Sequence, residues 1–158
     1  LNVEDTEVGQ KLSRVGYRVR VLPVLEVEHV KGYDLAGLLR TDFLRSMSLA
    51  RLKLRKRADA IGNDTSVPTG YIVSVPLALA GALALVVGLA ARLPVSCVAG
   101  VVALGAVLVL NVPFLRLLRI HGGTRVWAAG CGILVIELLT AGAGSAAGIA
   151  TFIAGRKY

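Results

Sequence analysis

The sequence is poor in the residues that mark several classes of functional site. Only two cysteines occur among 158 residues, and both Cys97 and Cys131 lie in apolar runs, so neither a disulfide framework nor a CxxC site is predicted. Aromatic residues make up 5% of the chain and do not interleave with the cations, which disfavours nucleic acid as a partner. Serine, histidine and cysteine form no triad-like set, and the glycines form no phosphate-binding loop.

Charge is almost absent from the second half of the chain. Residues 71–91 and 93–115 carry no charged residue, and residues 126–155 carry one, Glu137. Each run exceeds the roughly 20 residues that cross a hydrocarbon core of about 30 Å. Together with a mean hydropathy of +0.70, this predicts an α-helical membrane region of about three spans. The small residues at 142–148 predict either a bend or close packing on a neighbouring helix.

The charges that are present gather before these runs. The net charge is +8, and residues 31–57 hold eight basic and two acidic residues. Residues 34–58 are predicted to form an amphipathic basic helix that faces anionic lipid at a membrane surface. Its apolar stripe consists of Leu35, Leu39, Phe43, Met47, Ala50 and Leu54. The segment 116–125, between the last two runs, contains three arginines, and the positive-inside rule places it in the cytoplasm with the basic helix.

The first 33 residues resemble the end of a soluble domain. A helix is predicted over 1–16, because an apolar stripe follows acidic residues and Gly16 suits a helix end. Residues 17–22 and 25–30 alternate as half-buried strands do. A helix and two short strands bury too little surface to fold alone, so we interpret 1–33 as the last piece of an α/β domain. Residues 59–70 are a predicted linker.

Several side chains could carry chemistry, and each also has a structural explanation. Glu4 and Asp5 either cap the first helix or include a general base. His29 ends the second strand, either packed or as a metal or phosphate ligand. Lys31 belongs to the same strand end, and with two helix arginines it could hold a diphosphate.

The helix arginines in that set are Arg40 and Arg45. The later cations, residues 51–57, are more typical of a face directed at lipid headgroups. Glu137 is costly in lipid, so it is either a functional residue or a structural one that lies near an interface or in a helix contact.

Four segments, in order, carry a family resemblance. They are Glu4-Asp5-Thr6-Glu7-Val8-Gly9, Leu12 to Val19 with its Gly-Tyr pair, Val27-Glu28-His29-Val30-Lys31, and Leu38 to Arg45 with the sequence LLRTDFLR. Together they resemble the end of bacterial membrane-bound family 2 glycosyltransferases. The first residue is not Met, and the chain is expected to be cut from a longer protein.

The resemblance implies a GT-A catalytic domain, an inverting transfer from a nucleotide-sugar donor and a divalent metal, Mg or Mn. It implies that Asp5, with Glu4 beside it, deprotonates the acceptor, that His29 helps to bind metal or diphosphate, and that Lys31, Arg40 and Arg45 contact the diphosphate. The QxxRW motif of processive members and the DxD metal motif are absent. The piece is therefore not expected to be active alone.

The expected location is the bacterial inner membrane, with the catalytic part in the cytoplasm. The expected acceptor is lipid-linked or delivered by the membrane. The competing interpretation is a non-enzymatic multi-span scaffold whose basic segment only binds anionic lipid, which Glu137 and the small residues at 142–148 favour.

Overall fold

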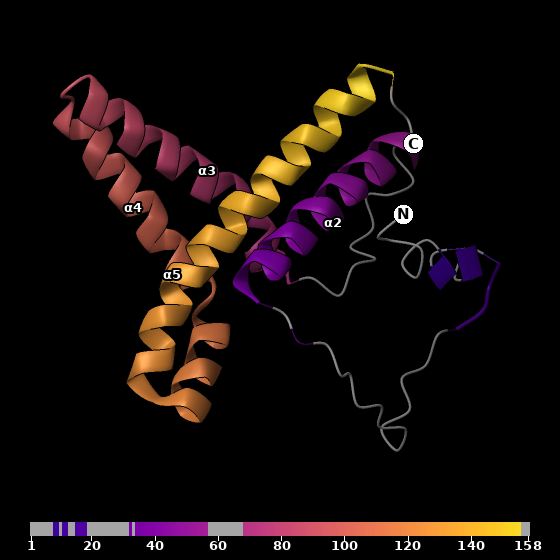
Figure 1. Cartoon of the computed structure of the whole chain (residues 1–158), viewed down its shortest axis with the longest axis horizontal. Coiled ribbons are helices and arrows are strands. Elements are labelled where there is room, and N and C mark those ends of the chain that lie inside the picture. The colour runs from indigo at the N-terminus through magenta and orange to yellow at the C-terminus, as the bar shows by residue number, and fades with distance from the viewer. Residues whose placement is uncertain are drawn as a thin grey trace. The chain divides into compact units, whose positions relative to one another are not determined.

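The described part of the chain is built from helices. The computed structural model describes residues 8–9, 11–12, 15–18, 32, 34–56 and 68–155. Its main elements are α2 (Leu35–Lys56), α3 (Thr69–Ala90), α4 (Pro94–Leu110) and α5 (Val112–Ile153) (Figure 1). They belong to two compact units. One comprises residues 1–66 and 144–158, and the other comprises residues 67–143.

The prediction of an α/β fragment is wrong for the described residues, whose regular structure is all helical and which contain no strand. The predicted strands 17–22 and 25–30 lie outside these residues except for Tyr17 and Arg18, which have no regular structure. Six alternating residues are a weak signal, because a strand also needs a partner strand to complete its hydrogen bonds. The described part of the chain offers no such partner.

The end of the predicted first helix is partly described. Val8, Gly9, Lys11 and Leu12 are helical. Gly16 takes a φ of 92°, and the Tyr17 amide donates a 3.0 Å hydrogen bond to the Leu12 carbonyl. This is the hydrogen bond of a helix that ends on a left-handed glycine, as the sequence predicts.

α3 and α4 form an antiparallel hairpin held close by glycine. A Cβ at Gly88 would lie 2.7 Å from the Cys97 sulfur, so only glycine allows this approach. Across the hairpin, the Ser96 hydroxyl donates a 2.8 Å hydrogen bond to the Ala84 carbonyl. The turn contains Arg92 at a φ of 55°, and Pro94 occupies the first turn of α4, where its missing amide costs nothing.

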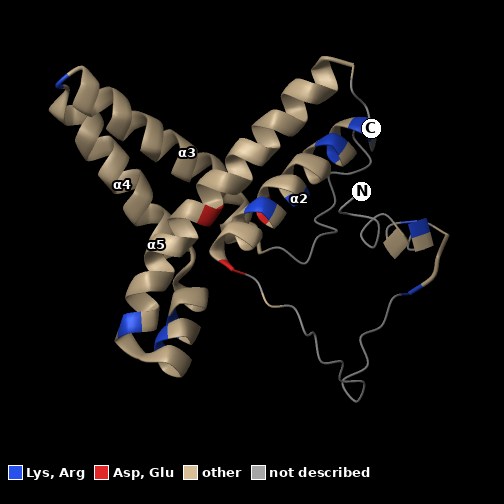
Figure 2. Cartoon of the chain, viewed as in Figure 1, with Lys and Arg blue, Asp and Glu red and all other residues tan. Residues whose placement is uncertain are grey.

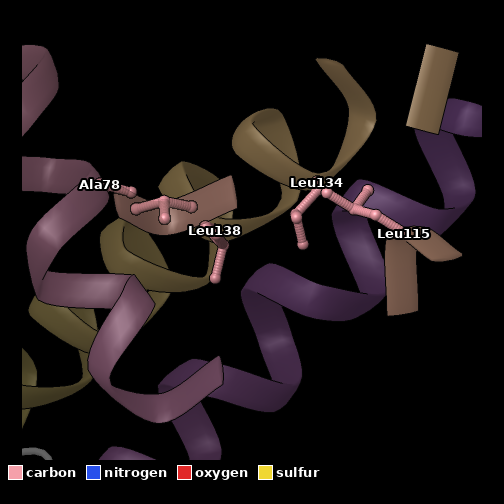
Figure 3. Close-up of a cluster of buried hydrophobic side chains, with 5 residues drawn as sticks. Ala78, Leu115, Leu134 and Leu138 are labelled. Carbon is pink, nitrogen blue, oxygen red and sulfur yellow. The ribbon is translucent and has the colours of Figure 1, made fainter. Parts of the chain in front are cut away.

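α5 is two helical segments joined at Gly123. This glycine has a φ of 71° and a ψ of −172°, and it interrupts the helix between residues 112–122 and 124–153. The segment 116–125, predicted to connect two spans, is therefore helical apart from Gly123. Leu115 precedes the turn, and Leu134 and Leu138 follow it. Figure 3 shows these three side chains with Ala78 of α3 in the buried cluster of the second unit, which also includes Val107 of α4.

The apolar helices expose much of their surface. Among the described helices, α3 and α5 are long and apolar enough to cross a membrane, and the 17-residue α4 is apolar but shorter. Only 22% of the most apolar stretch of α3 and 28% of that of α5 is buried, whereas the core helix of a soluble protein is mostly buried. The exposed apolar residues include Leu83, Val86, Leu89, Val95, Val98, Val101, Val102 and Val109. This pattern is typical of a membrane protein.

Candidate functional site

The basic helix α2 begins at a side-chain cap. Asp34, immediately before the helix, accepts a 2.7 Å hydrogen bond through Oδ1 from the amide of Gly37. That bond satisfies one of the amide groups that a helix leaves unpaired at its start, and the negative charge suits that end of the helix dipole. The Thr41 hydroxyl also donates a 2.8 Å bond to the Gly37 carbonyl. The first turn of α2 is thus fixed from both sides of Gly37, a residue that by itself disfavours a helix.

The middle of the α2 apolar stripe packs on the end of α5. Gly144 faces the backbone of Phe43, and Gly148 faces the backbone of Met47. Because residue numbers rise together along both helices, the two segments run parallel, side by side (Figure 1). A glycine at every fourth position is a known surface for close helix packing. We call this pairing of α2 with residues 144–153 the α2–α5 contact.

One arginine completes the α2–α5 contact. Arg51 donates hydrogen bonds to the Thr151 hydroxyl oxygen from Nε at 3.0 Å and from Nη2 at 2.8 Å. The same hydroxyl donates to the Ala147 carbonyl at 2.6 Å. The threonine therefore uses the lone pairs of its oxygen for the guanidinium and its proton for its own helix. This arrangement fixes the register of the two helices.

α2 also contains a buried carboxylate oxygen. Asp42 Oδ2 is buried and has no hydrogen-bond partner in the described part of the chain. Burial raises the pKa of the Asp42 carboxyl above its ordinary value, and the nearby Arg45 guanidinium opposes part of this shift. Desolvation disfavours the charged form of an acid, so this aspartate is less acidic than one on an open helix face.

The sequence-predicted site residues are only partly described. Arg40 and Arg45 lie on α2 with exposed side chains. Glu4, Asp5, His29 and Lys31 lie outside the described residues, so their roles remain predictions.

Sequence reasoning missed two features of α2. The sequence places Arg51 among the lipid-facing cations, whereas the structure pairs it with Thr151. The sequence also gives no sign that a carboxylate oxygen of Asp42 is buried. Close packing is one of the two predictions for the small residues at 142–148, and Gly144 and Gly148 do pack closely, but nothing in the sequence identifies α2 as the partner.

A second group of polar contacts joins the helices of the other unit. The Tyr71 hydroxyl donates a 3.0 Å hydrogen bond to Glu137 Oε1. One turn further along α3, Ser74 accepts a 2.8 Å bond from Asn111 Nδ2, and both of these residues are buried. Asn111 also donates to the Val107 carbonyl. Glu137 thus belongs to a helix contact, one of the two interpretations that the sequence leaves open.

The described residues offer no ready metal centre. They contain no group of three or more His, Cys, Asp or Glu side chains that could hold an ion. The predicted metal ligand, His29, lies outside them, so no chemical step is assigned to a metal. Comparisons with protein-family models, curated proteins and solved structures found no match to this chain.

Proposed function

We propose that this chain is part of an integral-membrane glycosyltransferase that transfers a sugar from a nucleotide-sugar donor to an acceptor hydroxyl with inversion. The observation that carries the proposal is the ordered set of motifs around Asp5, His29, Arg40 and Arg45, followed directly by apolar helices. The acceptor is lipid-linked or delivered by the membrane, and the enzyme belongs to the bacterial inner membrane with its catalytic side in the cytoplasm.

The geometry of α2 supports this proposal. Arg40 and Arg45 are exposed on a helix that is capped at Asp34 and packed through Phe43 and Met47. Because the helix backbone is already ordered, only the two side chains need to be ordered when these cations bind a diphosphate through charge-assisted hydrogen bonds. In this proposal they hold the donor diphosphate together with Lys31.

The remaining roles follow the resemblance. Asp5, with Glu4 beside it, deprotonates the acceptor, and His29 is the proposed ligand of Mg or Mn. The exposed Lys53 and Arg55 side chains contact anionic headgroups at the membrane surface. General-base catalysis typically accelerates a reaction by about 10²- to 10⁴-fold, which is the effect expected of Asp5.

The test uses the protein purified from its native membrane, with sugar transfer as the assay. Asp5→Asn should lower kcat by about 10²-fold or more, with little effect on the KM for the donor. Arg40→Gln with Arg45→Gln should instead raise that KM. Lys53→Gln, which removes a cation from the same helix, is the matched control and should change neither. Wild-type turnover by Asp5→Asn would exclude the proposed base.

A non-enzymatic membrane scaffold is the second candidate. It is favoured by the structural roles of Glu137 and of the small residues at 142–148. Glu137 accepts a hydrogen bond from Tyr71, and Gly144 and Gly148 make room for α2. The scaffold predicts that the native protein, in lipid vesicles, binds no nucleotide sugar, as measured by equilibrium dialysis. Saturable donor binding that requires Arg40 and Arg45 would exclude it.

A further inference from the structure

The turn of α5 carries a concentrated positive charge. Arg116 and Arg119 precede Gly123, and Arg125 follows it, and all three arginines are exposed. We call these three arginines the basic turn. Figure 2 shows cationic positions on both helical segments near this turn. The sequence contains no Asp or Glu between Asp64 and Glu137, so this charge is uncompensated locally.

The basic turn is held in place by packing on its inner side. Leu115 is buried with Leu134, and Leu118 closes on the helix after the turn at Gly130. The left-handed backbone of Gly123, at a φ of 71°, lets the chain reverse tightly enough for these contacts. The arginines are therefore presented by two helical segments that pack on each other beside Gly123.

Apolar and aromatic groups surround the arginines. Leu117 and Ile120 are 56% and 64% exposed. The Arg119 guanidinium lies 5.9 Å from the centre of the Trp127 ring, within the range of a cation–π interaction. Exposed aliphatic side chains mixed with arginine and tryptophan are characteristic of the boundary between hydrocarbon and headgroups, where tryptophan and arginine have one apolar and one polar part.

We propose that the basic turn binds anionic phospholipid headgroups. Arginine matches the phosphate group through paired charge-assisted hydrogen bonds, while Leu117 and Ile120 enter the acyl chains beside it. Each cation near an anionic surface contributes roughly a fivefold factor in partitioning. The proposal is independent of the glycosyltransferase assignment, because it involves only residues 115–130 and holds equally for a scaffold.

The sequence supplies a reporter for this site, because Trp127 is the only tryptophan. The whole chain is reconstituted into equimolar phosphatidylglycerol and phosphatidylcholine vesicles in which only one of the two lipids carries bromine on its acyl chains. We expect brominated phosphatidylglycerol to quench Trp127 fluorescence more strongly than brominated phosphatidylcholine. Added salt should reduce this difference, because it screens exposed charges.

Two triple variants test the assignment to the basic turn. Arg116→Gln with Arg119→Gln and Arg125→Gln should abolish the difference between the two lipids. The matched control removes three exposed cations elsewhere, through Lys11→Gln, Arg18→Gln and Arg92→Gln, and it should keep the difference. Because each protein is compared with itself in two vesicles, a change in the intrinsic fluorescence of Trp127 does not affect the result.

A charge-conserving variant distinguishes the loss of positive charge from a structural effect of substituting the three arginines. Arg116→Lys with Arg119→Lys and Arg125→Lys keeps the positive charge and should retain most of the lipid preference. Equal quenching by both lipids in the unmodified protein would overturn the proposal and would leave an acidic protein surface as the partner for these cations. Loss of the preference in the matched control would also overturn it, since net charge rather than the basic turn would then be responsible.

Discussion

The α3–α4 hairpin and the α2–α5 contact both bring helices close at glycine, but across very different lengths of chain. In the hairpin, the hydrogen bond between Ser96 and Ala84 joins residues 12 apart. In the α2–α5 contact, the bond between Arg51 and Thr151 joins residues 100 apart. A short turn holds the hairpin helices together, whereas closing a long loop costs more entropy. The distant pair therefore depends more on the quality of its contact, and it includes an arginine with two hydrogen bonds.

The largest expected effect is the loss of glycine from the hairpin. A Cβ at Gly100 would lie 2.6 Å from Leu85 Cγ and 2.8 Å from the Gly81 carbonyl oxygen. Because the turn prevents the helices from separating, Gly100→Ala should destabilise the protein by about 1–3 kcal/mol. The measurement is thermal unfolding in detergent, followed by circular dichroism.

Gly105 provides the matched control on the same helix. Nothing lies within 4 Å of a Cβ built there, so Gly105→Ala should be neutral or should stabilise α4 by up to about 1 kcal/mol. An equal loss of stability in both variants would contradict the close packing of this hairpin.

The same change in the α2–α5 contact should have a smaller effect. A Cβ at Gly148 would lie 2.5 Å from the Met47 carbonyl oxygen and 3.0 Å from the Ala50 Cβ. α2 can move away because no short turn ties it to α5, so Gly148→Ala should cost about 1–2 kcal/mol. Faster proteolysis within α2 would report the weakened contact. Gly132→Ala, on α5 with open space around its Cβ, should leave the proteolysis rate unchanged.

The sequence predicted these two regions unequally. The uncharged runs at 71–91 and 93–115 overlap the helices of the hairpin, because apolar length indicates such elements, but α4 ends at Leu110 and residues 112–115 begin α5. The apolar stripe of α2 predicts that one face of this helix is covered, but nothing in the sequence identifies a segment 100 residues away as the partner. Gly123 was also missed as a turn within a helical pair, because glycine and arginine together at 116–125 are equally typical of a loop. The α/β prediction failed because alternation over six residues does not specify a partner strand.

The contribution of Arg51 to the stability of the α2–α5 contact can be measured with a double-mutant cycle. Arg51→Gln and Thr151→Val should each destabilise the protein, and together they should cost less than the sum, with a coupling of about 1 kcal/mol. Arg51→Lys keeps the charge but cannot form two bonds from a planar fork, so it should recover only part of the coupling. Thermal unfolding of the four proteins in detergent gives the energies. Additive effects would show that Arg51 and Thr151 do not interact, and the two regions would then differ only in loop length.

The smallest expected effect concerns the buried carboxylate of α2, for which the α3–α4 hairpin has no counterpart because its sequence contains no acidic residue. Burial raises the pKa of folded Asp42 above its ordinary value of 3.8, so the folded protein binds the proton more tightly than the unfolded chain. The contribution of Asp42 to stability is therefore most favourable below pH 3.8, and it is lost as the pH rises through the folded-state pKa. Asp42→Asn should be more stable than the unmodified protein at neutral pH, and this advantage should vanish in acid.

Thermal unfolding midpoints, measured from neutral pH down into acid, test whether ionised Asp42 destabilises the protein. Arg45→Gln removes the charge that opposes the shift, so it should move the transition of Asp42 to higher pH and enlarge the neutral-pH advantage of Asp42→Asn. Asp34→Asn keeps a capping oxygen at the exposed start of the same helix, and it should not reproduce the stabilisation. A neutral-pH loss of stability in Asp42→Asn would mean that the carboxylate is paired rather than desolvated. The α2–α5 contact would then resemble the hairpin, because each buried side-chain polar atom in the described residues would have a hydrogen-bond partner.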